Sequence, residues 1–360
     1  MAAQTQSALL TRAGGWIHRH AWWVVVVWIA VAGGLNVAVP QLEQVVSSHS
    51  ADFLPQDLPA NRALEKMAAD FGVPPSNGVS SIILADENGF DAADADYYQR
   101  LVERLTADHE NVAYLVDLYS DEMTREIAVS EDGKAVNLLL AGEGSTGSTR
   151  AHHAAEAVRD HIAELDPPAG LQVHFSGPTA TLADLFAEID VSLLIITGVS
   201  ILLITVLLLV AYRNLVTALI PLITIGITLA VVRPIIGLLG DAGVLSVSNF
   251  TIAIMTALVL GAGTDYAIFT IGNYHEARRQ GRALGDSVAR ASGRTGPILV
   301  ASALTIAAAC GSMAFTKIGM FTTAGPPTAL AVLLALAVAV TLPPALLSLA
   351  GRRGWAEPRR

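Results

Sequence analysis

One carboxyl group lies inside a stretch of sequence that carries no other charge. Asp265 belongs to LGAGTDYAIFTIGNY, residues 260–274, which is otherwise apolar or neutral. An ionised acid at the centre of a bilayer costs at least about 2.5 to 3.5 kcal/mol on insertion scales, so its presence there indicates a function. A carboxyl group in that setting can hold a proton near neutrality and release it when water or a hydrogen-bond donor arrives. Asp265 is therefore predicted to be the titrating group of a proton relay.

The neighbours of Asp265 fit a helix that contacts another helix. Tyr266 offers a hydroxyl group beside the carboxyl group, although ordinary packing is an equally open interpretation of it. Residues three and four positions before Asp265 share its helix face, and small side chains there let a second helix approach closely. The predicted packing residues of this helix are Gly261, Ala262, Gly263 and Thr264. The alternative is a structural Asp265, which caps a broken helix or bonds to backbone without any part in transport.

Six apolar runs predict a membrane protein with six spans. Of the 360 residues, 52% are hydrophobic and 15% are charged, and the mean hydropathy is +0.51. Crossing the hydrocarbon core takes about 20 residues. Runs of about this length lie at residues 21–39, 191–211, 215–239, 250–272, 297–316 and 328–350. The first run follows Arg19 and His20 and lacks a convincing cleavage site, so we interpret it as an uncleaved signal anchor.

The positions of the arginines predict the orientation of the spans. The connections on one side hold twelve arginines, whereas the short loops on the other side hold Lys317, with Arg233 near a helix end. The positive-inside rule then places both termini in the cytoplasm and residues 41–190 in the periplasm, in a multi-pass inner (plasma) membrane protein. Residues 41–190 contain 27 Asp and Glu against 8 Arg and Lys. So acidic a segment argues against a nucleic-acid partner.

Residues 41–190 are long enough for one folded domain. Their patterns predict helices at 58–72, 92–110 and 148–165, strands at 79–85, 112–120 and 171–177, and a hairpin at 126–142. The hairpin is expected to turn at Asp132 and Gly133. This order of elements is typical of an α+β split βαβ, or ferredoxin-like, fold. Residues 178–194 keep helical periodicity, which predicts one continuous helix from this domain into the second span.

The sequence thus predicts four parts. A cytoplasmic N-terminus with the first span (1–40) precedes the periplasmic domain (41–190), five further spans (191–350), and a cytoplasmic tail or linker start (351–360). In the basic connection between the fourth and fifth spans, Leu284, Val288 and Ala291 fall at helical spacing. This connection is either a helix on the inner membrane surface or a plain basic loop.

Three smaller features receive structural interpretations. The Gly-Pro-Pro sequence at 325–327 predicts a stop before the sixth span. Asp265 is expected about 10 Å from the cytoplasmic end of its run, and Arg233 differs from it in height by about 17 Å, so the two should not pair. Cys310, the single cysteine, is predicted to be a small packing residue.

The residues around Asp265 also carry a resemblance. GAGTDYAIFTIGNYHEARRQG resembles the fourth transmembrane helix of the mycobacterial membrane protein large (MmpL) transporters, a branch of the resistance-nodulation-division superfamily. SADFLPQDLPANRALEKMAADFG, YRNLVTALIPL and ILVASALTIAAACGSMAFTKI match further blocks of that family in order. The resemblance implies proton-driven export of lipids, glycolipids or siderophores. It also implies a periplasmic porter domain, protons as the coupling ion, no other cofactor, and a small MmpS-type accessory protein.

In that family the paired Asp and Tyr, here Asp265 and Tyr266, form half of the relay. Members have twelve spans with a second Asp and Tyr on the tenth, so the resemblance implies a missing C-terminal half or a second copy of this chain. A shortened chain, a truncated reading frame and a half-transporter all stay open. Asn273 stands where members commonly carry an arginine, which puts only local anchoring in doubt.

Three other functions are weighed against transport by such an exporter. An intramembrane aspartyl protease needs two carboxyl groups that share a proton, and no other predicted span contains an acid. A protein-translocation motor subunit of the SecD and SecF type also has six spans and an outer domain. A sterol-sensing, receptor-like member of the same superfamily would differ by lacking proton-dependent flux. No metal site is predicted, because the histidines show no ligand spacing.

Overall fold

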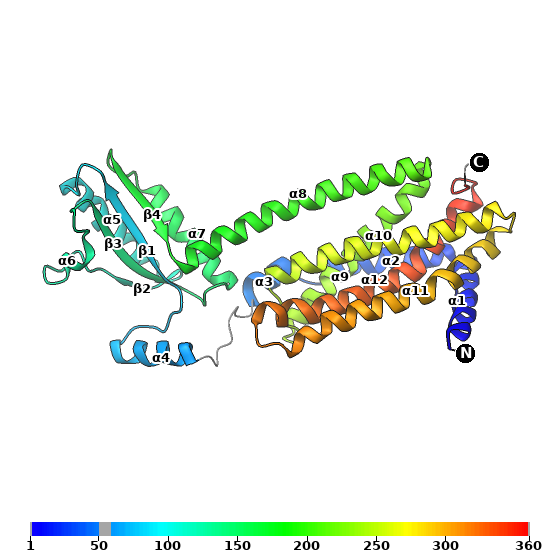
Figure 1. Ribbon diagram of the computed structural model, residues 1–360, viewed down its shortest axis with the longest axis horizontal. Helices are drawn as coiled ribbons and strands as arrows, with labels where there is room; N and C mark the ends of the chain where they lie inside the picture. The colour runs from blue at the N-terminus through cyan, green and yellow to red at the C-terminus, as the bar shows by residue number, and fades with distance from the viewer. Residues whose placement is uncertain (1, 50–58, 359–360) are drawn as a thin grey trace. The chain divides into compact units, whose positions relative to one another are not determined.

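The computed structural model describes residues 2–49 and 59–358 (Figure 1). The described residues fall into two compact units. The helical unit draws on Met1–His49 and Ser192–Arg360, and the sheet unit on Ser50–Val191. Helix α8 (Pro178–Tyr212) begins in the sheet unit and continues without a break into the helical unit, as residues 178–194 predict.

The helical unit consists of strongly apolar helices and three others. The apolar helices are α2 (Ala21–Ala38), the second part of α8, α9 (Leu215–Asp241), α10 (Asn249–Arg279), α11 (Leu284–Ser312) and α12 (Gly319–Arg352). The others are α1 (Ala2–Arg19), α3 (Leu42–His49) and the 3-10 helix η1 (Met313–Phe315). Six helical segments, counted among the described residues, are long and apolar enough to cross a membrane. Each of the six predicted runs overlaps one of these segments.

The basic connection between the fourth and fifth spans is shorter than predicted. Helix α10 continues to Arg279 and α11 already begins at Leu284. Val288 and Ala291 are buried in a cluster with Ile271 of α10, and Leu284 packs against that cluster. The interpretation of this segment as a surface helix or a loop is therefore wrong. Its apolar side is covered by other spans, and only its arginine-bearing side is exposed.

Helix α12 runs through residues 325–327, so the predicted stop is also wrong. Pro327 has no N–H to donate to the carbonyl of Thr323, which would leave that carbonyl unpaired within the helix. The hydroxyl of Thr251 in α10 donates to it instead, at 2.8 Å. A side chain also replaces the missing backbone donor in α9. Pro234 frees the carbonyl of Ala230, and the Asn36 side-chain amide of α2 donates to it at 2.6 Å. Side chains of neighbouring helices thus make the prolines tolerable.

Helix α1, which the sequence analysis does not predict, packs along the first turns of α11. Glycines make this contact possible, because a Cβ at Gly14 would lie 2.7 Å from that of Ser292 and one at Gly296 would lie 2.6 Å from Leu10. The end of α1 is tied to α12, since the Arg352 side chain donates to the His18 carbonyl at 2.6 Å. The two ends of the chain therefore lie at the same end of the helical unit (Figure 1).

The sheet unit holds a four-stranded antiparallel sheet. Its elements are α4 (Pro59–Phe71), β1 (Val79–Asp86), α5 (Ala92–Ala107), β2 (Val112–Val116), α6 (Arg125–Ala128), β3 (Ala135–Gly142), α7 (Thr149–Glu164), β4 (Leu171–Ser176) and the start of α8. The strand order is β2-β3-β1-β4, and all neighbours are antiparallel. Alternate residues of β1 and β3, such as Ile82 and Leu138, form one core with Tyr98 of α5 and Val158 of α7.

Most of the predicted elements of this unit are confirmed, with one error. The first arm of the hairpin at 126–142 is no strand, since residues 125–128 form the short helix α6 and a single bridge joins Val129 to Val136. Strand β2 occupies the edge of β3 that this arm would have used. The turn itself is confirmed, with Gly133 at a φ of 71°. Leu58, the first residue of the predicted helix 58–72, lies outside the described residues.

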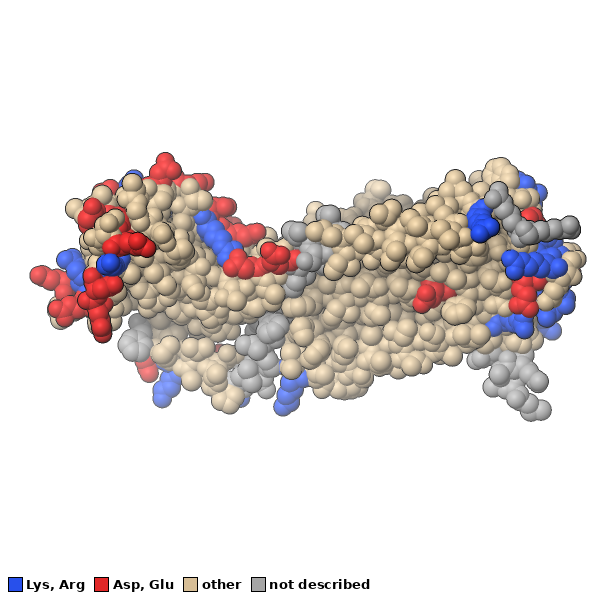
Figure 2. Space-filling model, turned by 45° about the horizontal axis from the view of Figure 1, so that its top comes forward, with Lys and Arg blue, Asp and Glu red and all other residues tan. Residues whose placement is uncertain are grey.

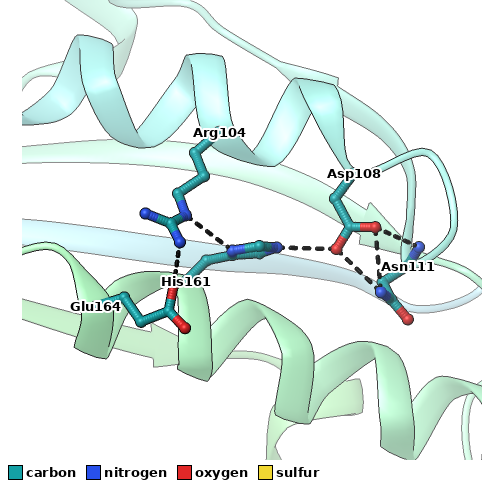
Figure 3. A network of polar contacts seen from close by, with 5 residues as sticks. All are labelled: Arg104, Asp108, Asn111, His161 and Glu164. Carbon is teal, nitrogen blue, oxygen red and sulfur yellow. Dashed lines mark hydrogen bonds and ion pairs between the residues drawn. The ribbon is translucent and has the colours of Figure 1, made fainter.

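A chain of polar contacts joins the ends of α5 and α7 (Figure 3). Arg104 can only donate, so its Nε–H bonds to Nδ1 of His161 at 3.1 Å and the ring proton resides on Nε2. That nitrogen donates to Asp108 at 2.9 Å. Asn111 donates to the same carboxylate through its backbone and its side-chain amide. Burial alone would raise the pKa of Asp108, but the hydrogen bonds from Asn111 and His161 together lower it below its ordinary 3.8.

Asp108→Asn should lower the stability of the chain at pH 7 by about 1 to 3 kcal/mol, because it weakens several hydrogen bonds to a charged group. A carboxyl group with a depressed pKa in the folded state stabilises above its unfolded pKa, and this stabilisation disappears as the pH falls through the folded value. The difference from wild type should therefore shrink below pH 3.8. Thermal unfolding of the purified chain followed by circular dichroism measures it. Asp96→Asn, in an exposed pair on the same helix, is the control and should change little at any pH.

Candidate functional site

Asp265 lies near the middle of α10, the helix that positions it. This helix has 31 residues, and a rise of 1.5 Å per residue places Asp265 about 24 Å from Asn249 and about 21 Å from Arg279. The predicted run ends at residue 272, about 10 Å from Asp265 along the helix, and α10 continues beyond it to Arg279. Asp265 is consequently far from both ends of its helix, where an acid would usually meet water.

The side chain of Asp265 faces away from the other helices of the unit. It belongs to a row of exposed residues spaced three or four apart, which we call the α10 outer face. The row comprises Ile254, Ala257, Gly261, Asp265, Phe269 and Gly272. Phe269 is 54% exposed, and a Cβ added at Gly261 or Gly272 would meet nothing within 4 Å. Figure 2 shows one small acidic patch within the otherwise uncharged wall of the helical unit.

Among the described residues, Asp265 has no hydrogen bond and no ion pair. Arg233, the basic residue that the sequence analysis considers as a partner for Asp265, pairs with Glu43 of α3 instead. The expectation that Arg233 does not pair with Asp265 therefore agrees with the structure. An unpaired carboxyl group on an apolar helix surface is an energetically unfavourable arrangement in lipid.

Tyr266 faces the opposite way, into the core of the helical unit. It is 3% exposed and packs with Leu299 and Ala303 of α11 and with Val332 of α12. Its hydroxyl group is buried and has no hydrogen-bond partner among the described residues. Successive residues of a helix point about 100° apart, so the neighbouring Asp265 is directed outwards. The structure thus places the predicted pair on two different surfaces of one helix, without a hydrogen bond between them.

The four small residues before Asp265 are divided between the same two surfaces. Gly261 is exposed on the α10 outer face and Ala262 is half-buried against the Tyr266 cluster. Gly263 is buried, and a Cβ there would lie 3.6 Å from Ile225 of α9. The buried Thr264 hydroxyl donates to the Leu260 carbonyl at 2.6 Å within the helix. A Cβ at Gly263 would therefore make only an ordinary contact with α9, whereas Gly261 leaves space on the outer face.

A small cavity that the sequence analysis does not predict lies close to Tyr266. Its volume is about 70 Å³, and Leu299, which packs on Tyr266, is one of its walls. Ser292 and Thr295 of α11 also line it, and their buried hydroxyl groups have no partner in the described part of the chain. The remaining lining is mostly apolar, so these two hydroxyl groups are the polar partners that a water molecule would find there. Ser292 and Thr295 precede the predicted run 297–316, and the sequence carries no clear signal for the cavity.

The described residues contain no group of three or more His, Cys, Asp or Glu side chains that could hold a metal ion. Cys310 is buried and unbonded at the position where α11 approaches α12. A Cβ at Gly325 of α12 would collide with the Cys310 carbonyl oxygen, so this is a site of close helix packing.

The chain is similar to known membrane transport proteins over nearly its whole length. The model of the MMPL family matches residues 52–360. The probable transport protein MmpL9 of Mycobacterium tuberculosis is 36% identical over 94% of this chain and 35% of its own length. The sulfolipid-1 exporter MmpL8 of the same species is 36% identical over 97% and 32%, and the probable transport protein MmpL4 of Mycobacterium leprae is 35% identical over 96% and 36%. The chain thus spans about a third of the length of these relatives.

Asp265→Leu should leave the unfolding temperature of the purified 360-residue chain unchanged or raise it, because the carboxyl group has no partner to lose and is costly in an apolar surrounding. Tyr266→Ala, one residue along the same helix, should destabilise the chain by about 3 to 5 kcal/mol through a cavity in the core. Thermal unfolding in detergent compares the two variants. A loss for Asp265→Leu as large as that for Tyr266→Ala would mean that Asp265 has a partner within this chain.

Proposed function

Because the chain belongs to the MMPL family, we propose that it forms one half of a proton-driven exporter of lipids, glycolipids or siderophores. It is a multi-pass membrane protein whose matched relatives are named transport proteins, so its class of activity is transport and not catalysis. An intramembrane protease would need a second carboxyl group beside Asp265. No described acid lies near enough to bond with it.

The observation that carries the proposal is the unpaired Asp265 on the α10 outer face. An acid in mid-membrane costs several kcal/mol unless it is covered by polar groups or water. The α10 outer face supplies the space for such a cover, since Gly261 lies one turn before Asp265 and no described side chain fills it. We infer that the C-terminal half of a longer protein, or a second copy of this chain, lies on this face and brings the second acid and hydroxyl of the relay.

Proton movement through such a relay can drive a conformational cycle. A transmembrane potential supplies about 2.3 kcal/mol per elementary charge per 100 mV. In the proposal Asp265 takes up and releases the proton, and Tyr266 tunes this exchange from the core side of α10. The unpartnered Tyr266 hydroxyl and the nearby cavity support a water-filled approach to the relay from that side. Protons are the coupling ion, and no other cofactor is part of the proposal.

We propose that the sheet unit is a ferredoxin-like porter domain, and we place it in the periplasm with both termini in the cytoplasm. Two observations support this assignment. The antiparallel order β2-β3-β1-β4, with a helix after β1 and after β3, is that of a split βαβ unit. Basic side chains gather at one end of the helical unit (Figure 2), and α1 and α12 both end where Arg352 bonds to His18, which fits the positive-inside rule for a cytoplasmic end. The unbroken helix α8 would transmit force between the two units.

The substrate class follows from the relatives. One of them is named a sulfolipid-1 exporter, which favours a lipid or glycolipid for this chain over a siderophore. A small MmpS-type accessory protein remains part of the proposal for the complete exporter.

Asp265→Asn in the full-length protein should fold and insert normally but abolish export driven by a proton gradient, since the amide keeps the size and cannot release a proton. Tyr266→Phe should reduce export less, because it removes a hydroxyl group and not the titrating group. Glu276→Gln is the matched control, an exposed acid near the end of the same helix, and should export normally. Lipid export assayed in membrane vesicles with an imposed pH gradient measures all three. Wild-type export by the Asn variant at equal expression would eliminate the relay role of Asp265.

The proposed orientation is tested by cysteine labelling in intact cells. The experiment uses a Cys310→Ala background and a membrane-impermeant maleimide. The reagent should label Glu131→Cys, which is exposed in the sheet unit, and should miss Gln280→Cys, which is exposed at the C-terminal end of α10. Permeabilised cells, in which both variants should react, provide the control. Labelling of the Gln280 variant alone in intact cells would invert the topology.

A further inference from the structure

A groove of about 430 Å³ runs between α1 and the first turns of α11. Its walls, which define the α1–α11 groove, are Ser7 and Thr11 of α1 and Arg282, Asp286, Ala289, Arg290, Gly293 and Arg294 beside or within α11. Gly293 lets the Thr11 side chain lie directly against the α11 backbone. The groove therefore depends on close packing of two helices that are remote in sequence, and it is separate from the α10 outer face.

The arginines of the groove are poorly neutralised by the protein itself. Arg290 is half-buried and has no hydrogen bond or ion pair with the side chains and backbone that the structure describes. Arg294 lies 3.4 Å from Glu276, but both side chains are 55% exposed, and such pairs contribute little. Among the described residues, the Arg282 side chain donates to the Gln280 amide oxygen alone, at 3.4 Å. With Asp286 as the one acid in its wall, the groove keeps an excess of positive charge.

The surroundings of the groove are apolar surface that faces outwards. Ile298, one turn of α11 beyond Arg294, is 59% exposed. On α1, Leu9 and Trp16 are also exposed, on the side of the helix turned away from Ser7 and Thr11, and tryptophan is enriched where a protein meets the membrane–water interface. A molecule held here would contact cationic side chains at one end and the hydrocarbon-facing surface of a span at the other.

We propose that the α1–α11 groove binds the phosphate headgroup of an anionic phospholipid, with the acyl chains along the exposed surface at Ile298. Guanidinium groups bind phosphate oxygens through paired, charge-assisted hydrogen bonds, and basic pockets between spans on the cytoplasmic side suit lipid headgroups. Free phosphate would use the same arginines but would gain nothing from the apolar surface. The bound lipid would hold α1 against α11.

Native mass spectrometry of the purified chain tests the site with three probes: phosphatidylglycerol, phosphatidylcholine and inorganic phosphate. Phosphatidylglycerol should bind on the order of tenfold more tightly than phosphatidylcholine, and Arg290→Gln with Arg294→Gln should abolish most of this preference. The double replacement by lysine keeps the charge and should retain part of it. Asp286→Asn removes the one acid of the groove and should strengthen binding of phosphatidylglycerol.

Arg279→Gln is the matched control, because Arg279 is an exposed arginine at the same end of the unit and outside the groove. It should leave the lipid preference unchanged. The proposal is overturned if Arg279→Gln weakens binding as much as the double variant, or if all glutamine variants bind phosphatidylglycerol like wild type. Inorganic phosphate that displaces phosphatidylglycerol at equal concentration would also overturn it in favour of a simple phosphate site. Size-exclusion chromatography of each variant verifies folding. If the double glutamine variant does not fold, the lipid preference of the double lysine variant tests the proposal instead.

Discussion

The helical unit depends on one constraint, which is that polar groups inside apolar helices must find partners without water. Prolines make this constraint visible. Pro327 and Pro234 each leave a carbonyl unpaired, and the Thr251 hydroxyl and the Asn36 amide of other helices donate to those carbonyls. These contacts join α12 to α10 and α9 to α2. The positions where a helix lacks a backbone hydrogen bond are therefore positions where it is bonded to a neighbouring helix. The packing of the unit is therefore specified by hydrogen bonds as well as by apolar contacts.

Asp265 departs from this constraint with the strongest consequence for function, because it is the acid within a span. Among the described residues, donors reach the two freed carbonyls but none reaches the Asp265 carboxyl group. On its exposed side Asp265 lies between Gly261, one turn before it, and Phe269, one turn after it. No described side chain fills the space at Gly261, so a surface that leaves the acid uncovered there is suited to a partner helix. On the buried side of α10, the Tyr266 hydroxyl likewise has no hydrogen-bond partner among the described residues.

Sequence reasoning identified the spans and most of the sheet unit because both depend on local patterns. Apolar length defines a span, and alternation defines β1 and β3. It failed where tertiary contacts decide. Residues 325–327 read as a stop because the Thr251 donor lies 76 positions from Pro327 in the sequence, and residues 126–129 read as a strand because nothing local shows that β2 takes that edge. Asp265 was identifiable from its energetic cost alone. Its outward direction was not, because a helix that is apolar all round has no polar stripe to indicate its faces.

Sequence reasoning missed the small cavity near Tyr266 and the α1–α11 groove, and helix α1 lines both of them. Gly14 and Ile17 of α1 line the small cavity, and Thr11 lines the α1–α11 groove. Displacement of α1 would therefore open both at once. Leu299 lines the cavity and also packs on Tyr266, so the cavity that α1 helps to enclose lies close to the tyrosine of the proposed relay. If an anionic headgroup holds α1 in place, the lipid composition of the membrane would affect the access of water to the proposed relay from this end. Proton coupling would then depend on a lipid that is not the transported one.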